Sequence, residues 1–254
     1  MDFFSYPKRL EKVQFLKRYK RFLVDVLTCD NITETVHCAN SGSMRSCLEE
    51  NCDAYLLESD NPKRKLKKSL ELMNLKDGLA CLNTQRANDF VASLLKKIIE
   101  NREDSGKFSV LKDLKKYIKV LREAVFSKQT RFDFCLLDKD HKKCWIEVKS
   151  VSLRLDNKTI AFPDAVTLRG QKHLLELMDA VSQGEESWLF FVVMRGQGVD
   201  AKELAESFRP AFEIDKEYHR LFQKALKSGV KMAIIVPRIE PEGFGLRFMK
   251  RIEE

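Results

Sequence analysis

The chain has 254 residues, with 46 Lys and Arg against 38 Asp and Glu and a formal net charge of +8. This length allows one larger domain or two small ones, and the basic surplus favours a polyanionic partner such as nucleic acid. No run of about 18 apolar residues occurs and no secretory signal opens the chain, so we expect a cytoplasmic protein without membrane contact. The chain has seven cysteines, which is an odd number, and no Cys-x-x-Cys motif. We therefore expect free thiols.

Short apolar segments separated by turn residues occupy residues 1–82. The predicted strands are residues 16–27, 33–38, 53–58, 70–75 and 78–82, with a helical turn near 46–50. About five short strands with this spacing fit a small β-barrel.

Basic residues are interleaved with aromatic ones at the start of the first predicted strand, and a second basic run follows a turn. These residues are Lys17, Arg18, Tyr19, Lys20, Arg21 and Phe22, and then Lys63, Arg64 and Lys65. A barrel with such a face suits single-stranded nucleic acid, through base stacking and phosphate contact. A solvated charged face is the plain alternative.

Residues 83–254 predict helices and strands in a mixed sheet. Helices are expected at residues 83–102, with Thr84 as the N-cap, and at 110–117, 170–183 and 215–228. Strands are expected at residues 120–126, 187–194, 232–236 and 244–251, the third ended by Pro237 and the last at a sheet edge. Helices flanking such a sheet form the usual layered arrangement.

A β-hairpin is predicted within residues 131–150, with strands 132–137 and 144–148 around a polar tip. Its first strand carries Asp133, and alternation puts Glu147 and Lys149 on one face of the second. Buried charges are usually paired or bind a metal, and two carboxylates suit Mg²⁺. Lys149 could then activate an attacking water or contact a phosphate oxygen. The alternative is a solvated strand edge with an internal Glu–Lys pair.

Eight segments of the chain, in order, resemble the sugar fermentation stimulation protein A family. They are residues 18–26 (RYKRFLVDV), 36–44 (VHCANSGSM), 61–65 (NPKRK), 83–88 (NTQRAN), 131–134 (RFDF), 147–151 (EVKSV), 162–167 (FPDAVT) and 169–174 (RGQKHL). Each segment is weakly specific alone, but together they span nearly the whole chain.

The resemblance implies an OB-fold-like domain at residues 1–82 and a PD-(D/E)XK nuclease-like domain at residues 83–254. It also implies nonspecific DNA binding and a link to sugar metabolism. By position, Asp133, Glu147 and Lys149 match the nuclease motif, and Gln171 matches a glutamine that some relatives place on the following helix. The first helix of this domain has Gln85, Asn88 and Asp89 where many nucleases have a glutamate, which implies a weaker metal site.

We therefore expect Asp133 and Glu147 to hold Mg²⁺ or Mn²⁺, and Asp133, Glu147, Lys149 and Gln171 to be catalytic. The residues predicted to contact DNA are Arg18, Lys20, Arg21, Lys63, Arg64, Lys65, Arg86, Arg169 and His173. For His173 a structural role is the alternative, and Asp164 is either a helix cap or a site residue.

Two functions follow from these expectations. The first is a metal-dependent deoxyribonuclease, and the second is a non-cleaving DNA-binding regulatory protein. A helicase- or repair-associated accessory factor is a third candidate. A phosphate-binding glycine loop and a nucleophile elbow are both absent from the sequence, so nothing favours a small-molecule enzyme.

Overall fold

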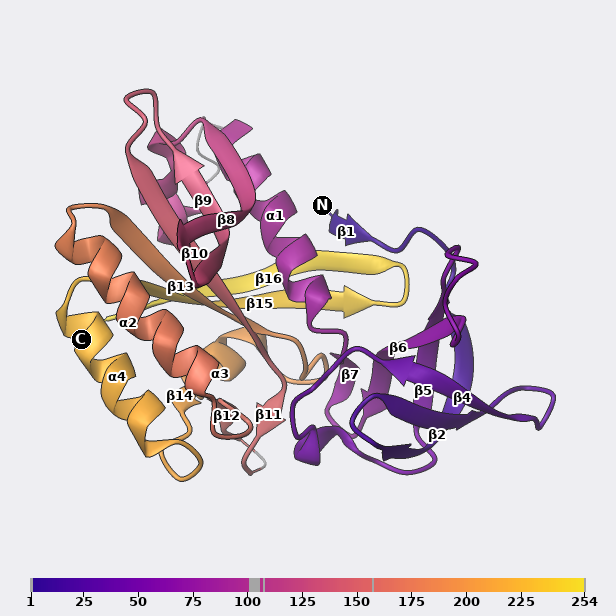
Figure 1. The fold of residues 1–254 in the computed structure, drawn as a ribbon. Helices are drawn as coiled ribbons and strands as arrows, with labels where there is room; N and C mark the ends of the chain where they lie inside the picture. The colour runs from indigo at the N-terminus through magenta and orange to yellow at the C-terminus, as the bar shows by residue number, and fades with distance from the viewer. Residues whose placement is uncertain (1, 101–105, 107, 157, 254) are drawn as a thin grey trace.

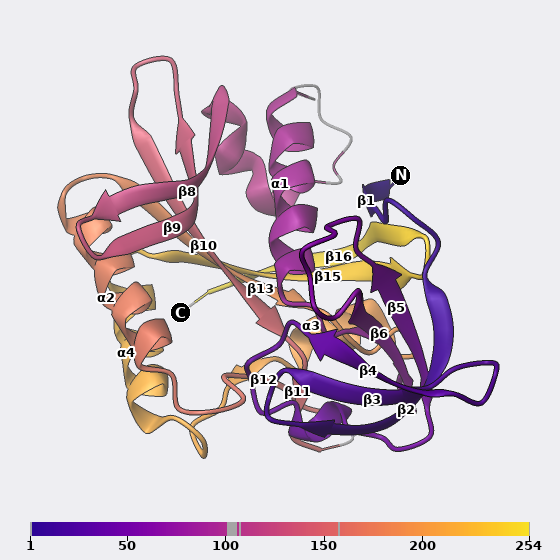
Figure 2. The same ribbon diagram turned by 45° about the vertical axis from the view of Figure 1, so that its right-hand side comes forward.

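The computed structural model describes residues 2–100, 106, 108–156 and 158–253. A small barrel lies beside a larger domain in which helices cover a twisted sheet (Figures 1 and 2). The seven cysteines, all of them described, are free thiols, as predicted. Among the described residues, no helix combines the length and apolar character needed to cross a bilayer.

The barrel is an OB-fold. Its strands are β2 (Glu11–Tyr19), β3 (Leu23–Leu27), β4 (Thr33–Cys38), β5 (Asp53–Glu58) and β6 (Lys68–Leu75). The first three pair in an antiparallel meander, β5 pairs with β2 and β6, and the parallel pairing of β4 with β6 closes the barrel. This is the strand order of an OB-fold. The 3₁₀ helix η1 (Arg45–Cys47) precedes β5, and β7 (Gly78–Cys81) extends the sheet beside β6.

The single strand predicted at residues 16–27 is two strands in the structure. Lys20 and Arg21 have φ angles of 48° and 62°, so the chain turns there and β3 returns antiparallel to β2. Neither residue is a glycine, and left-handed backbone at two ordinary residues is not signalled by the sequence.

The second domain is built on a mixed sheet. Within the described residues its order is β1 (Asp2–Ser5), β16 (Gly243–Ile252), β15 (Lys231–Glu240), β13 (Glu186–Val193), β10 (Lys143–Val151), β9 (Thr130–Leu137) and β8 (Lys119–Ser127). The central strands β10, β13 and β15 are parallel. The predicted hairpin is confirmed, because β9 and β10 pair antiparallel with Trp145 opposite Cys135.

Helices cover both faces of this sheet (Figure 1). On one face lie α1 (Gln85–Glu100) and the 3₁₀ helix η2 (Ser109–Lys116), and on the other lie α2 (Leu168–Ser182), α3 (Ala201–Glu206) and α4 (Lys216–Lys227). Alternate residues of β10 supply the two cores, with Ile146 and Val148 packed towards α1 and Trp145 packed towards α2. A small sheet of β11 (Leu153–Arg154), β12 (Ile160–Phe162) and β14 (Arg209–Pro210) lies at one end.

Three predictions about individual elements are wrong: a strand end, a strand's place in the sheet and a helix cap. Pro237 does not end its strand, since β15 continues to Glu240 through a register shift between Val236 and Pro237, where a missing N–H is tolerated. Strand β16 is not at the edge, because β1 pairs beyond it. Thr84 does not cap α1: the Asn83 side chain accepts from Gln85 N at 3.2 Å, and the Thr84 hydroxyl faces Ala39 O. The predicted helix end at Arg102 lies outside the described residues.

The division predicted between residues 82 and 83 stays a prediction. This division falls between β7 and α1. In the sequence β1 comes before the barrel strands, but in the structure it pairs with β16 and so belongs to the sheet of the second domain. The N-terminal strand therefore belongs structurally to the larger domain.

A buried ion network joins the two domains. Asp77, just before β7, accepts a bidentate pair of hydrogen bonds from Arg195 at 2.9 and 3.0 Å and a further one from Arg154 at 2.7 Å. Arg195 is only 3% exposed, and its guanidinium also donates to Ser46 O and Ser152 O. Because removing one partner would leave charge buried, this network fixes how the barrel sits on the second domain.

Candidate active site

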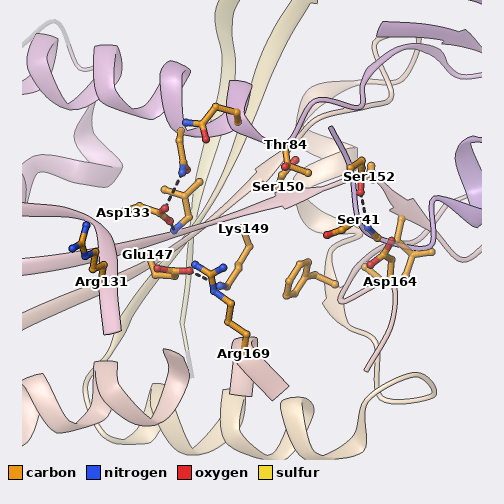
Figure 3. A pocket seen from close by; sticks show the side chains of 18 of the residues that line it. Ser41, Thr84, Arg131, Asp133, Glu147, Lys149, Ser150, Ser152, Asp164 and Arg169 are labelled. Carbon is orange, nitrogen blue, oxygen red and sulfur yellow. Dashed lines mark hydrogen bonds and ion pairs between the residues drawn. The ribbon is translucent and has the colours of Figure 1, made fainter. Parts of the chain in front are cut away.

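A polar cleft of about 420 Å³ lies between the barrel and the second domain (Figure 3). Its walls come from residues 40–42 of the barrel, from the start of α1, from β9 and β10, and from the segment before α2. The two carboxylates and the lysine predicted from the hairpin all line it. Glu147 and Lys149, which alternation puts on one face of β10, therefore lie in the same cleft as Asp133 of β9.

Asp133 is held from two sides. Its Oδ1 accepts a hydrogen bond from Asn88 Nδ2 of α1 at 2.8 Å, and its Oδ2 accepts one from the backbone N–H of Val148 at 2.8 Å. The carboxylate thus bridges α1, β9 and β10. Each oxygen keeps a second lone pair for another ligand.

Glu147 is almost fully buried, and its two oxygens differ. Oε1 accepts from Lys149 Nζ at 2.5 Å and from His173 Nδ1. Oε2 is buried without a hydrogen-bond partner in the described structure. A buried, unpaired carboxylate oxygen is costly, and a cation is the kind of ligand that would remove this cost. The residues present therefore fit a divalent metal held by Asp133 and Glu147.

The two carboxyl groups ionise differently. Burial and the nearby Glu147 charge raise the pKa of Asp133 to about 7. Burial also opposes ionisation of Glu147, but the Lys149 ammonium and His173 outweigh it and lower the Glu147 pKa to about 2. Metal-free protein near neutral pH thus holds one fixed negative charge on Glu147 and a second on Asp133 that titrates.

The side chain of Gln171 is hydrogen-bonded to Asp215 and not to Asp133 or Glu147. Its side-chain nitrogen donates to Asp215 at 2.9 and 3.1 Å, and Asp215 also caps α4. This geometry does not support its predicted catalytic role.

His173 is buried, at 5% exposure, against Glu147 rather than open to a phosphate. This burial favours the structural alternative, and the phosphate contact predicted for His173 stays a prediction. Since Glu147 is ionised, His173 Nδ1 donates to it, and Nε2 is left to accept from Arg169 Nε at 3.5 Å.

The other residues predicted to contact DNA differ in how available they are. Lys20, Arg21, Lys63, Lys65 and Arg169 are exposed, and Arg169 also lines the cleft. Arg86 is committed to Glu71 and Asp89, and Arg18 donates to four backbone carbonyls. DNA contact by these residues stays a prediction, and the first group is the better placed.

Asp164 lines the cleft and does not cap α2. Its carboxylate accepts from Ser43 Oγ and Met44 N at 3.2 Å, whereas Thr167 caps α2 by accepting from Gly170 N. Asp164 therefore joins the cleft wall of one domain to the barrel loop of the other. The sequence left both roles open, because a Pro-Asp pair before a helix suits either.

Other cleft residues were not predicted. Hydroxyl groups of Ser41, Thr84, Ser150 and Ser152 line it, with Arg131 at one end. By alternation Ser150 falls on the face of β10 opposite Glu147 and Lys149, and Ser152 lies just beyond the end of the strand, so the period-2 pattern that groups Glu147 with Lys149 could not have identified them.

Two family descriptions match the chain. Residues 16–82 match the "SfsA N-terminal OB domain", and residues 85–243 match the "Sugar fermentation stimulation protein RE domain". The chain belongs to the sugar fermentation stimulation protein family. The predicted family and fold class are confirmed, since both matched regions have the folds described above.

Relatives in this family cover almost the whole chain. The "Sugar fermentation stimulation protein homolog" of Pelagibacter ubique is 41% identical over 231 residues, covering 89% of each chain. The homolog of Saccharophagus degradans is 42% identical over 231 residues, covering 90% of each. A solved structure described as Pyrococcus furiosus SfsA in complex with Ca²⁺ superposes with a TM-score of 0.80 at 19% identity, covering 100% of this chain and 98% of that one.

Proposed function

We propose that the cleft hydrolyses phosphodiester bonds of DNA with a bound Mg²⁺ or Mn²⁺. The observation that carries this proposal is the buried, unpartnered Oε2 of Glu147, a residue that lines the cleft together with Asp133 and Lys149. The Pyrococcus furiosus protein, whose solved structure is a complex with Ca²⁺, supports a divalent-cation site in the family.

Each side chain of the cleft has a distinct part in this proposal. Asp133 and Glu147 would hold the metal, which when bound polarises the phosphoryl group and lowers the pKa of water. Lys149 keeps Glu147 ionised and presents an ammonium group for a water or a phosphate oxygen. Arg169 and Arg131 line the same cleft and supply positive charge for the DNA backbone.

A second candidate function is DNA binding without cleavage, with the link to sugar metabolism that the family description names. The donor set favours this alternative in one respect. The described residues contain no cluster of three or more His, Cys, Asp or Glu side chains, and α1 offers an amide, Asn88, to Asp133 instead of a carboxylate. Two carboxylates alone make a weaker metal site.

Cleavage of labelled single- and double-stranded DNA in Mn²⁺, Mg²⁺ or EDTA tests the proposal. We expect cutting that requires metal and falls at least about 100-fold in Asp133→Asn and Lys149→Ala, because each removes part of the catalytic set. Lys139→Ala, an exposed lysine at the hairpin tip, is the matched control and should cut like the native protein. Salt-sensitive binding by all four proteins without cutting in any metal would favour the second function.

A further inference from the structure

Phe22 is an aromatic side chain that the barrel leaves on its surface. It follows the left-handed pair Lys20 and Arg21 and is 48% exposed. Its ring lies parallel to that of His37 across β3 and β4, with an interplanar angle of 5° and centroids 6.5 Å apart. The backbone holds this pair in place, because Phe22 O accepts from Cys38 N at 2.9 Å.

The His37 ring is fixed from the other side by the loop between β5 and β6. Arg64 Nη2 lies 3.3 Å from His37 Nδ1 and donates to Ser69 Oγ at 3.0 Å. A guanidinium has only donors, so Nδ1 accepts and the imidazole is neutral. Lys63 and Lys65, on either side of Arg64, are exposed. The ring pair thus has Arg64 against His37, and exposed cations adjoin both Phe22 and Arg64 in the sequence.

Arg18 connects this surface to the cleft. Its Nε donates to Arg21 O at 2.9 Å, in the turn that carries Phe22. Its Nη2 donates to Asn40 O at 2.7 Å and Gly42 O at 3.0 Å, and both of these residues line the cleft. One guanidinium therefore holds the turn and the cleft rim together.

We propose that Phe22 and His37 form a base-stacking platform that guides a single DNA strand along the barrel into the cleft. This inference rests on the proposed function of the cleft and specifies its substrate as single-stranded DNA. Only an unpaired strand has bases free to stack on a side chain, whereas bases in a duplex already stack on one another. The platform also lies at the OB-fold strands and loops that suit oligonucleotides, and Lys20, Arg21, Lys63 and Lys65 are placed for its phosphates.

Binding in EDTA tests the platform without any cleavage. The probe is a fluorescein-labelled thymidine oligonucleotide of about 16 nucleotides, the upper site size of one OB-fold, followed by anisotropy. Phe22→Ala should weaken binding about 10-fold, as loss of one stacked base does, while a duplex of equal length should change by less than about 2-fold. Phe212→Ala is the matched control: Phe212 is 50% exposed and also contacts a histidine, His219, but lies beside α4.

A conservative variant gives a second measurement. Phe22→Trp should bind like the native protein, and its exposed indole should be quenched by the oligonucleotide. The native tryptophans, Trp145 and Trp188, are 4% and 0% exposed and should change little.

The outcomes separate this inference from the proposed function. Unchanged single-strand affinity in Phe22→Ala, equal loss for single strand and duplex, or an unquenched Phe22→Trp would each overturn the platform. Loss of single-strand binding in Phe22→Ala, with no metal-dependent cutting by the native protein, would keep the platform and remove the nuclease.

Discussion

Asp133 and Glu147 line the same cleft, but their surroundings favour opposite charge states. Glu147 has a lysine and a histidine beside it, whereas Asp133 has an amide, a backbone N–H and the Glu147 charge. A second carboxylate without its own cation is a cost to the folded, metal-free protein. A bound divalent metal would attract both carboxylates and remove their mutual repulsion, which favours metal binding.

Asp133→Asn should therefore stabilise the metal-free protein at neutral and alkaline pH. The Asp133 pKa rises from 3.8 to about 7, so the folded state keeps a proton that the unfolded state has lost between these values. The native free energy of unfolding falls as pH rises through this window, and the variant lacks this fall. Its advantage should reach on the order of 4 kcal/mol above about pH 7, since each of the roughly three pKa units is worth about 1.4 kcal/mol, and shrink towards about pH 4.

Thermal unfolding in EDTA across this pH range is the measurement. The lowered pKa of Glu147 does not contribute here, since its stabilisation is lost only below its ordinary value, towards about pH 2. Asn88 can turn its amide to suit the new side chain. Mn²⁺ should stabilise the native protein and not the variant. Parallel pH profiles for the two proteins would contradict the raised pKa.

At the scale of elements, β1 packs against α1, the helix whose Asn88 holds Asp133. Phe3 of β1 is 4% exposed, and its ring lies 5.5 Å from that of Phe90, on the helix that carries Asn88. Phe3→Ala should reduce the free energy of unfolding by about 3 kcal/mol, because it leaves a cavity between strand and helix.

Urea unfolding checks this value, with Ile118→Ala as control. Ile118 is 50% exposed, so its truncation should stay within about 0.5 kcal/mol of native. A Phe3→Ala protein as stable as the control would show that β1 is not part of the folded core.

Local patterns predicted some elements and not others for physical reasons. The hairpin carries its own turn and alternation, so Asp133, Glu147 and Lys149 could be found together. Strand β1 has only four residues and a partner near residue 245, which no local pattern reports. On α2, Gly170, His173, Leu174 and Leu177 are buried, so helical phase alone would have favoured His173 over Gln171 as the residue facing Glu147.

At the scale of the molecule, the cleft exists only while the two domains keep their relative position. Asp77, with an 8% exposed side chain, pairs with Arg195 and Arg154 across that boundary. Asp77→Asn should lower stability by about 3 kcal/mol, since it leaves arginine charge buried without its partner.

Calorimetry should show a lower unfolding temperature for Asp77→Asn and little change for Asp30→Asn, an exposed barrel aspartate. An unfolding temperature equal to the native one would mean that the apolar contacts alone hold the domains together.

The pairing of β1 with β16 also bears on how the chain folds during synthesis. Asp2–Ser5 leaves the ribosome long before its partner around Gly245 is made. All paired strands of the barrel sheet lie within residues 11–81, so the barrel can fold before β16 is made. During that time the apolar strand β1 stays unpaired. The larger domain thus closes its sheet only after β16 has been translated, and the high sequence separation of this contact makes the step slow.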